Sequence, residues 1–500
     1  MAKKKTTKAL RDAGDAPLML GISGMRGIMG QSLTPEIALR YAAAFGTYLN
    51  ARQDGVRVLI GRDGRRGGEA YYEAAVAGLL GSGCSVRRLG IASTPTIGHA
   101  AMEGYDGAVI ITASHNPQEW NGLKFLVAGT AGHGKNEFGF ASAPPIDKAQ
   151  QIIEQYQRGP EWLPPSTLRP AQEDHDASYH HWLDVSGLMI ELLGDRGIAQ
   201  LMEHGHTGLR CVLDAVNSAG ATVGVPFLNN LAQVVQLHCS PGGIFPHTPE
   251  PTKENLSGKG ELCSVVPGVG ADVGFAQDPD ADRLAIVDEK GRYIGEEYTL
   301  VLSALCLLEM LEDPSQAVLV ANLSTSRMID DLAQRYGARV ERTPVGEAHV
   351  ASRMIQLLAK GQHVVLGGEG NGGVIWPAVS YVRDSIVGMG LTLALMARHG
   401  KPLSAIVDNL PSYAIIKSKQ DIPSKEAAQP AIELVSKAFE GRGRIDLQDG
   451  VRIDLDEQKA WLSVRASNTE PIVRIIAEAP NDKAAKALID EARALLAKVC

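Results

Sequence analysis

The sequence predicts an α/β protein that consists of three similar α/β domains and a smaller C-terminal α+β domain. A short apolar strand that runs into a polar turn, followed by a helical stretch, recurs three times along the chain. After residue 402 this pattern gives way to alternating apolar and polar positions. With 500 residues, the chain is also too long for a single hydrophobic core.

The repeated unit is the strand and turn that open each of the first three domains. Its apolar runs precede the polar turns at residues 61–64, 214–220 and 321–326. Within each unit a second apolar strand also ends in a polar loop, at Ser114, Asp278 and Glu369. The sequence therefore predicts that three polar loops from three sheets converge.

The fourth domain has a different pattern. Residues 451–455 and 460–465 alternate between apolar and polar side chains, which is typical of half-buried antiparallel strands. A third strand is expected at residues 471–479, and the Ala- and Leu-rich residues 483–499 predict a helix. Proline- and glycine-containing breaks then place the domains at residues 1–169, 170–292, 293–402 and 403–500.

Composition excludes several classes of protein. The 49 basic and 57 acidic residues give a net charge of −8, so nucleic acid is not an expected partner. No run of about 18 apolar residues predicts a membrane span, and the basic run near Lys4 lacks the apolar segment of a signal peptide. The six cysteines have no paired spacing, so we expect reduced thiols and a cytoplasmic protein.

The motif Thr112-Ala113-Ser114-His115-Asn116-Pro117 follows the apolar run at residues 108–111. Because loops at strand ends are where α/β proteins place their sites, Ser114 is a candidate for chemistry. Serine and asparagine also dominate helix caps and turns, so a purely structural turn is the competing interpretation.

The motif Asp278-Pro279-Asp280-Ala281-Asp282-Arg283 presents three carboxylates at alternate positions. In an extended loop they project to one side and offer hard oxygen ligands to a divalent cation, with Mg²⁺ preferred over Ca²⁺. An EF-hand loop is excluded, because Arg283 stands where that loop needs glycine. A solvated acidic turn is the alternative.

Two further loops offer groups for a phosphorylated sugar. Residues 367–373 present Glu369 and Asn371 on a glycine-rich backbone, which suits paired hydroxyls, whereas a flexible turn is the simpler interpretation. Residues 465–471 present a guanidinium, two hydroxyls and an amide, which match a phosphate dianion or cap a hairpin. The candidate phosphate ligands are Arg465, Ser467, Asn468, Thr469 and Arg474.

Two basic residues complete the candidates. Arg26 lies between glycines, where a backbone can approach a ligand closely. Lys124 follows the serine motif closely enough to lie beside it, although a surface lysine is the default interpretation.

Together these four loops resemble the α-D-phosphohexomutase superfamily, in the family's order and over nearly the whole chain. The resemblance implies three α/β domains with mixed sheets and a smaller α+β domain around a central cleft. It also implies an isomerase, an intramolecular phosphotransferase that converts hexose 6-phosphates into hexose 1-phosphates. The reaction passes through a phosphoserine enzyme and a hexose 1,6-bisphosphate.

The resemblance also implies the role of each residue. Ser114 carries the phosphoryl group and joins Asp278, Asp280 and Asp282 as a ligand of Mg²⁺. Glu369 and Asn371 hold sugar hydroxyls, and the loop that begins at Arg465 holds the distal phosphate. The remaining catalytic residues surround the reacting phosphate: Arg26, His115, Lys124 and Arg283. Lys124 is the candidate general acid and base, which requires a lowered pKa, and Glu347 lies on a loop without an assigned role.

Two departures bear on the substrate. Ile22 stands where the family's N-terminal motif usually carries a threonine, and the sugar loop is Glu369-Gly370-Asn371-Gly372-Gly373. That loop resembles the archaeal-type phosphoglucosamine mutases, so glucosamine phosphate is the expected substrate; phosphomannomutase or phosphoglucomutase is the alternative. The protein is expected to be a monomer or a homodimer.

Two other functions compete. A metallophosphatase would also use a phosphoserine and metal carboxylates, and a second cluster of histidine and aspartate ligands would favour it. The sequence shows no such cluster. A sensor that kept the fold but lost the chemistry is disfavoured by the intact Ser114 and the three aspartates.

Overall fold

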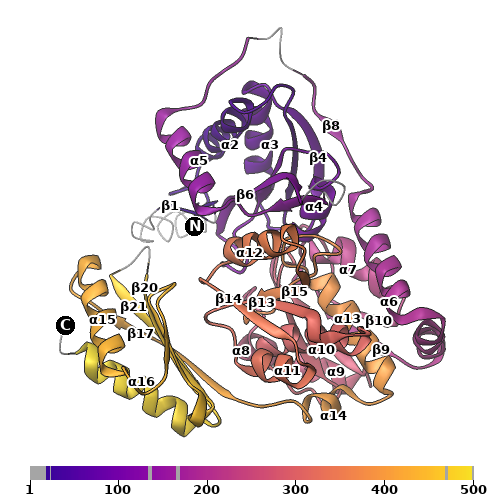
Figure 1. Cartoon of the computed structure of the whole chain (residues 1–500). Coiled ribbons are helices and arrows are strands. Elements are labelled where there is room, and N and C mark those ends of the chain that lie inside the picture. Colours follow the sequence, from indigo (N-terminus) through magenta and orange to yellow (C-terminus); the bar gives the residue numbers. More distant parts are fainter. Residues whose placement is uncertain (1–17, 23, 133–137, 165–168, 468–470, 498–500) are drawn as a thin grey trace, which may run out of the picture.

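The computed structural model describes residues 18–22, 24–132, 138–164, 169–467 and 471–497. Within these residues the strands form four sheets, one in each of four successive parts of the chain, domains I to IV (Figure 1). The predicted fold class is confirmed, since three parts are α/β and the last is a smaller α+β unit. The exact boundaries at 169, 292 and 402 stay predictions.

Domain I contains the largest sheet, with strand order β1-β2-β6-β5-β3-β4-β8, and β7 paired to β6. Strands β3, β4, β5 and β8 run parallel, and β1, β2, β6 and β7 pair in antiparallel fashion, so the sheet is mixed. Its strands are β1 (Met19–Gly21), β2 (Gly24–Ile28), β3 (Arg57–Arg62), β4 (Ser85–Ile91), β5 (Gly107–Ile111), β6 (Trp120–Ala131), β7 (Phe138–Ser142) and β8 (Gln172–Glu173). Its helices are α2 (Pro35–Asn50), α3 (Gly68–Gly81), α4 (Thr94–Ala101) and α5 (Ile146–Arg158).

Domains II and III each contain a four-stranded sheet, ordered β10-β9-β11-β12 and β14-β13-β15-β16. In both, three parallel strands are followed by one antiparallel edge strand. Strands β4-β3-β5-β6 of domain I have the same order, so the predicted three-fold repeat is a repeat of topology. The strands are β9 (Arg210–Asp214), β10 (Gln233–Leu237), β11 (Val273–Gln277), β12 (Leu284–Asp288), β13 (Ala317–Asn322), β14 (Arg339–Thr343), β15 (His363–Glu369) and β16 (Gly373–Ile375).

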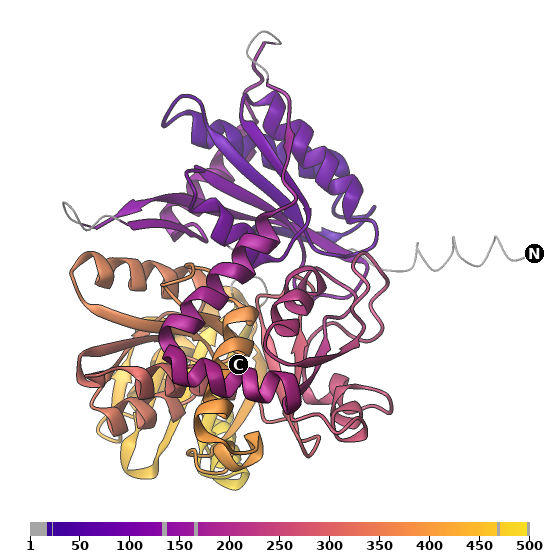
Figure 2. The ribbon, with the colours of Figure 1, turned by 90° about the vertical axis from the view of Figure 1, so that its right-hand side faces the viewer.

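Domains II and III share one hydrophobic core, which includes buried residues from Val185 to Leu410. Helix α6 packs against α4, α7 and α13, and Figure 2 shows it (magenta) running from domain I along the other two. Its buried His181 lies between Thr96 of α4 and Asp384 at the start of α13. The helices are α6 (Ala177–Thr207), α7 (Gly220–Asn229), α8 (Lys253–Leu256), α9 (Leu262–Gly268), α10 (Glu297–Met310), α11 (Met328–Tyr336), α12 (Glu347–Ala359), α13 (Ser385–His399) and α14 (Leu403–Val407).

Domain IV is an antiparallel sheet in the order β17-β21-β20-β19-β18, with its own core. Alternate residues of β19, β20 and β21 form this core, but the opposite face of these strands is also largely buried, so the expected half-burial was wrong. On that face Arg452 donates to the Leu323 carbonyl of domain III, and the buried Trp461 donates its indole N–H to Glu478 at 2.8 Å. Its elements are β17 (Ala414–Asp421), α15 (Ala428–Ala438), β18 (Arg444–Asp446), β19 (Val451–Leu455), β20 (Ala460–Ala466), β21 (Ile472–Ala479) and α16 (Asp482–Leu496). None of the helices in the described part of the chain is long and apolar enough to cross a membrane.

The loops of the candidate site follow the third strand of each repeat. Ser114 comes after β5, Asp278 after β11, and Glu369 ends β15. The loops contact one another, since Ser114 Oγ donates a hydrogen bond to Asp278 Oδ2 at 2.8 Å and the N–H of Leu284, just after the aspartate loop, donates one to the Gly372 carbonyl at 3.0 Å. The predicted convergence of three loops is therefore present.

Candidate active site

The serine loop is a strained turn held by buried polar groups. Ser114 has φ +51°, which is uncommon for a residue with a Cβ, and its N–H donates to Thr112 Oγ1 at 2.8 Å. Thr112 in turn donates to Asp63 at 2.7 Å, and Arg65 donates to the Ser114 carbonyl at 2.8 Å. Surrounding contacts thus fix the position of the serine hydroxyl.

The aspartate loop is a tight turn, so the expected extended loop was wrong. Ala281 has φ +56°, and Asp278 Oδ1 accepts the N–H groups of Asp282 and Arg283, each at 3.1 Å. The turn nevertheless brings the carboxylates of Asp278, Asp280 and Asp282 within 4.8 Å of one another. They converge because the backbone turns back between Asp278 and Asp282.

Ser114 and Lys124 contact this carboxylate cluster. Ser114 Oγ donates to Asp278 Oδ2 at 2.8 Å, and Lys124 Nζ donates to Asp280 at 2.6 Å and to Asp282 at 3.1 Å. Lys124 is not a surface lysine, since its side chain is 13% exposed. The serine loop of domain I and the aspartate loop of domain II therefore form one site.

The electrostatics of the cluster favour a further cation. Burial, together with Asp282 and Asp280, raises the pKa of Asp278 well above its usual range. Burial also acts to raise the pKa of Asp282, but Arg383, Lys124 and Arg283 outweigh it and lower the pKa. Asp280 Oδ1 and Asp282 Oδ1 are buried without a hydrogen-bond partner. These oxygens, beside Ser114, fit a divalent metal ion.

The pKa of Lys124 is shifted against expectation. Burial alone would lower it, but Asp280 and Asp282 outweigh burial and hold it above its usual value. The lysine is therefore a cation in this arrangement, and the lowering that the sequence led us to expect is not observed.

His115, Arg26 and Arg283 surround Ser114. The His115 Nδ1 atom lies 3.3 Å from Ser114 Oγ, and burial together with Arg283 and Arg26 lowers the pKa of His115 to about 3. His115 is therefore neutral. Arg26 donates to Asn116 Oδ1 at 2.9 Å, and burial lowers its pKa as well.

The glycines beside Arg26 serve strand pairing. A Cβ at Gly24 would lie 2.1 Å from the Leu123 carbonyl oxygen, so this glycine lets β2 approach β6. Gly24 thus has a structural role in strand pairing, and a close approach of this backbone to a ligand stays a prediction. Arg26 gains its position because β2 and β6 pair, with Arg26 opposite Gly122 and two residues from Lys124.

The sugar loop is tightly packed, which argues against a flexible turn. Glu369 accepts hydrogen bonds from Asn322 and from Arg383, each at 2.7 Å, and Asn371 Oδ1 accepts the N–H of Gly373 at 3.2 Å. A Cβ at Gly370 would lie 2.1 Å from the carboxylate of Glu297. Asn371 also lines a hollow together with Glu250, Arg283 and Glu296.

The loop of domain IV lies apart from the serine. Arg465, the last residue but one of β20, lies directly opposite Arg474 of β21, and its Nη1 lies 4.0 Å from Asp449. Burial lowers the pKa of Arg465, and Glu369 is close enough to oppose that shift. Ser467 donates its N–H to Ile472 at 3.0 Å, whereas Asn468 and Thr469 lie outside the described residues. Arg465 is thus near the sugar loop.

Comparison with known proteins places all four parts in one family. Residues 18–137, 196–291 and 296–413 match the alpha/beta/alpha domains I, II and III of phosphoglucomutase/phosphomannomutase, and residues 417–495 match its C-terminal domain. A probable phosphoglucosamine mutase of Methanopyrus kandleri is 34% identical, with 94% of this chain and 96% of the relative covered. A phosphoglucomutase/phosphomannomutase of Thermococcus kodakarensis is 35% identical, with 94% and 97% covered.

The chain belongs to the phosphoglucomutase/phosphomannomutase family. The resemblance to the α-D-phosphohexomutases is thereby confirmed. The fold agrees, because the crystal structure of a family protein of Burkholderia thailandensis superposes with a TM-score of 0.75 at 23% identity, covering 96% of this chain and 98% of that one. The roles of the individual residues stay predictions.

Sequence reasoning missed several residues of this phosphohexomutase site. Arg383 is buried and contacts Asp282 at 2.6 Å as well as Glu369. Of the two residues that hold the serine loop, Asp63 lies in the repeated turn at residues 61–64 without a predicted role, and Arg65 was not predicted. A signal for Arg383 was available, because Arg383-Asp384 directly precedes the apolar helix α13.

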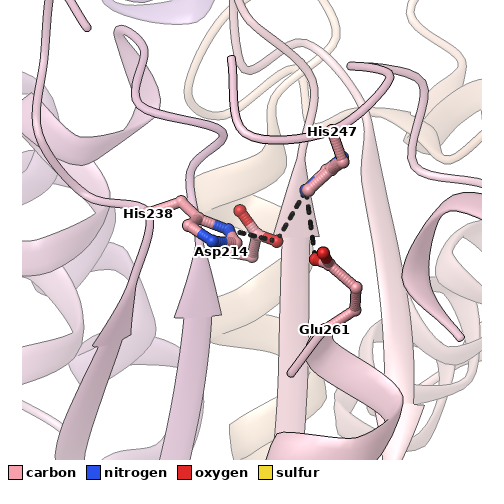
Figure 3. Close-up of side chains that lie close together, drawn as sticks. All are labelled: Asp214, His238, His247 and Glu261. Atoms are coloured by element: carbon pink, nitrogen blue, oxygen red, sulfur yellow. Dashed lines mark hydrogen bonds and ion pairs between the residues drawn. The ribbon is translucent and has the colours of Figure 1, made fainter. Parts of the chain in front are cut away.

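A second cluster of potential metal ligands corrects another expectation. Asp214, His238, His247 and Glu261 of domain II present ligand atoms within 4.8 Å of one another (Figure 3). They come from four separate segments of the chain, so no short motif reveals them. The expected absence of a second histidine and aspartate cluster was wrong.

Proposed function

We propose that this phosphohexomutase interconverts glucosamine 6-phosphate and glucosamine 1-phosphate through phosphorylated Ser114 and glucosamine 1,6-bisphosphate. The observation that carries the reaction is the Ser114 hydroxyl, held in a strained loop and hydrogen-bonded to Asp278 where domains I and II meet. The names of relatives such as the Methanopyrus kandleri protein support glucosamine as the sugar. Mannose and glucose phosphates are the alternative substrates.

We propose Mg²⁺ as the metal, held by Asp278, Asp280 and Asp282 with an oxygen of Ser114. Three carboxylates and two unpartnered buried oxygens suit a hard cation that also binds a phosphate oxygen. When bound, the ion would neutralise charge on the phosphoryl oxygens.

Side chains around Ser114 carry out the proton transfer and stabilise the charge of the phosphoryl group. As the phosphoryl group leaves, the P–O bond to Ser114 breaks and a bond to the free sugar hydroxyl forms. Cationic Lys124 donates a proton to the leaving serine oxygen, and the neutral lysine so formed takes up the proton that the sugar hydroxyl loses; the same two transfers run in the opposite direction when the phosphoryl group returns to Ser114. Arg26 and Arg283 stabilise charge on the phosphoryl oxygens, and neutral His115 orients the serine.

Two groups of residues hold the rest of the substrate. Glu369 and Asn371 bind sugar hydroxyls. Arg465, Ser467, Asn468, Thr469 and Arg474 bind the phosphate that does not react. We expect a cytoplasmic monomer or homodimer, and neither property changes the chemistry.

Peptide mass spectrometry and product assays test this function. We expect phosphate on Ser114 in the purified protein, and we expect Ser114→Ala to lose mutase activity while the control Ser315→Ala, at an exposed position, keeps it. The 6- and 1-phosphates of glucosamine, mannose and glucose are compared side by side with catalytic bisphosphate. A fully active Ser114→Ala variant would contradict the mechanism, and a preference for mannose or glucose would contradict the substrate.

The assays also separate a mutase from a metallophosphatase, which the second cluster of ligands brings back into consideration. A phosphatase releases inorganic phosphate in proportion to the sugar phosphate consumed. A mutase releases almost none, because the phosphoryl group returns to Ser114.

A further inference from the structure

The four side chains of the second cluster are brought together by the sheet of domain II. Asp214 ends β9, His238 directly follows the neighbouring strand β10, and His247 lies in the loop beyond it. Glu261 is the residue before helix α9. Figure 3 shows all four side chains pointing toward one another.

We propose that Asp214, His238, His247 and Glu261 bind one zinc ion with a structural role. Asp214 Oδ2 lies 3.3 Å from His238 Nδ1 and 2.9 Å from His247 Nε2. The same Nε2 atom of His247 lies 3.9 Å from Glu261 Oε2. Ligands about 2.0–2.2 Å from a tetrahedral zinc ion are separated by roughly 3.3–3.6 Å. The three separations bracket this range, and all four ligand atoms lie within 4.8 Å of one another.

A hydrogen bond from Nδ1 of His247 orients its ring so that Nε2 faces the cluster. His247 Nδ1 lies 2.8 Å from the Thr248 carbonyl, which can only accept, so Nδ1 carries a proton. In the neutral ring the lone pair of Nε2 points at Asp214 Oδ2, 2.9 Å away, so that either a metal ion or a second ring proton must lie between the two atoms. A second hydrogen bond of this kind commonly fixes a metal-binding histidine.

Each of the two carboxylates also has one oxygen that is available to the cluster. Asp214 is buried, and its other oxygen accepts the N–H of Val216 at 2.9 Å, so Oδ2 is left to face the cluster. Glu261 Oε2 is buried without a hydrogen-bond partner. A divalent ion would supply that partner, and it would balance the two negative charges if both imidazoles are neutral.

The ligand set favours zinc and a structural role. Imidazole nitrogens select zinc and related transition metals over Mg²⁺, which prefers oxygen ligands only. Four protein ligands complete a tetrahedral shell and leave no position for an activated water molecule. The cluster therefore does not supply the hydrolytic centre of a metallophosphatase.

The ion would fix a segment that supports the active site. Val216, Asn217 and His238 all have positive φ, between +45° and +54°, so the turns that carry two of the ligands are strained. Beside them, Ser218 donates to the Pro279 carbonyl of the aspartate turn at 2.5 Å. Phe245, between the two histidines, donates its N–H to Gln118 of domain I at 2.8 Å.

Metal analysis of the whole protein tests this site directly. Protein produced with zinc and dialysed against Mg²⁺ should contain about one zinc ion per chain. His247→Gln and His238→Gln should reduce the zinc affinity at least about tenfold. The exposed His363→Gln is the matched control and should retain zinc, as should Asp280→Asn, which alters only the aspartate cluster.

A second measurement keeps the proposal testable if a histidine variant fails to fold. The metal-free wild type, titrated with Co²⁺ alone, should develop the intense visible absorption of a tetrahedral complex, and Glu261→Gln should weaken it. Zinc should raise the thermal midpoint of the wild type and leave that of Glu261→Gln unchanged. Wild-type protein that binds neither zinc nor Co²⁺ would overturn the proposal and identify the cluster as an ion pair of protonated histidines. The proposed mutase function would be unaffected.

Discussion

At the scale of single residues, Arg383 contacts three acidic side chains of the active site. Its guanidinium contacts Asp282, Glu369 and Glu347, and the backbone N–H of Arg383 donates to Glu347 at 3.0 Å. Burial alone would lower the pKa of Arg383, but Asp282, Glu347 and Glu369 raise it well above the usual value. Glu347, which had no role from the sequence, therefore positions the arginine that joins the aspartate turn to the sugar loop.

We predict that Arg383→Lys and Arg383→Met separate geometry from charge. The methionine leaves three carboxylates without their cation, which should destabilise the fold by about 3–5 kcal/mol. The lysine keeps the charge but loses the planar, branched contact, so the fold should persist while kcat/KM falls by roughly tenfold or more. Thermal unfolding and mutase assays measure both effects. Full activity in Arg383→Lys would show that only the charge is needed.

At the scale of elements, the start of helix α10 lies beneath the sugar loop. Glu297 accepts the N–H of Ser326 at 2.9 Å, while its other oxygen is buried without a partner. An ionised carboxylate is usually favoured at a helix start. Here burial dominates and raises the pKa of Glu297 from 4.5 to about 8.

This shift predicts a pH dependence of stability. The folded protein keeps a proton on Glu297 that the unfolded chain has released, so this group makes the free energy of unfolding fall as pH rises from 4.5 to about 8. The free energy of unfolding of Glu297→Gln should equal that of the wild type near pH 4.5 and exceed it near pH 8. Each pKa unit corresponds to about 1.4 kcal/mol, so the gain should reach several kcal/mol. Urea unfolding at both ends measures it, and parallel pH profiles would contradict the assigned shift.

The elements also show what the sequence could and could not predict. Ser114, Asp278 and Glu369 were found because an apolar run that ends in a polar group marks the end of a buried strand. The tight aspartate turn was missed because its shape depends on Asp278 bonding to the backbone of its own loop. Arg383 and the cluster at Asp214 were missed because their partners lie on other elements, and residue spacing along the chain does not encode such contacts.

At the scale of the whole molecule, we propose domain IV as a second binding point for the substrate. Arg465 and Arg474 face each other across β20 and β21, and like charges in that position repel. Among the described residues, Asp449, with a carboxylate oxygen 4.0 Å from Arg465 Nη1, is the only acidic residue within ion-pair distance of either arginine. A phosphate group bound there would relieve the repulsion.

We predict that Arg465→Ala weakens catalysis equally for the 6-phosphate and the 1-phosphate. The non-reacting phosphate must occupy one place in both orientations, because the reacting end always meets Ser114. Loss of a charge-assisted contact should cost on the order of 1.5–3 kcal/mol in each case. The control Arg444→Ala, at the exposed end strand β18, should change neither. A defect confined to one isomer would show that the loop serves a single orientation.

The core shared by domains II and III also dictates an order of events during synthesis on the ribosome. The buried residues of domain I lie almost entirely before residue 153. This domain can therefore complete its hydrophobic core while the rest of the chain is still being synthesised. The core of domain II is completed only by side chains of α13 and residues up to Leu410. Until those residues emerge, the nascent chain exposes an apolar face of β9 and β11. Such a face, presented for nearly 200 residues of elongation between Leu213 and Leu410, is a binding site for a chaperone and a risk of aggregation.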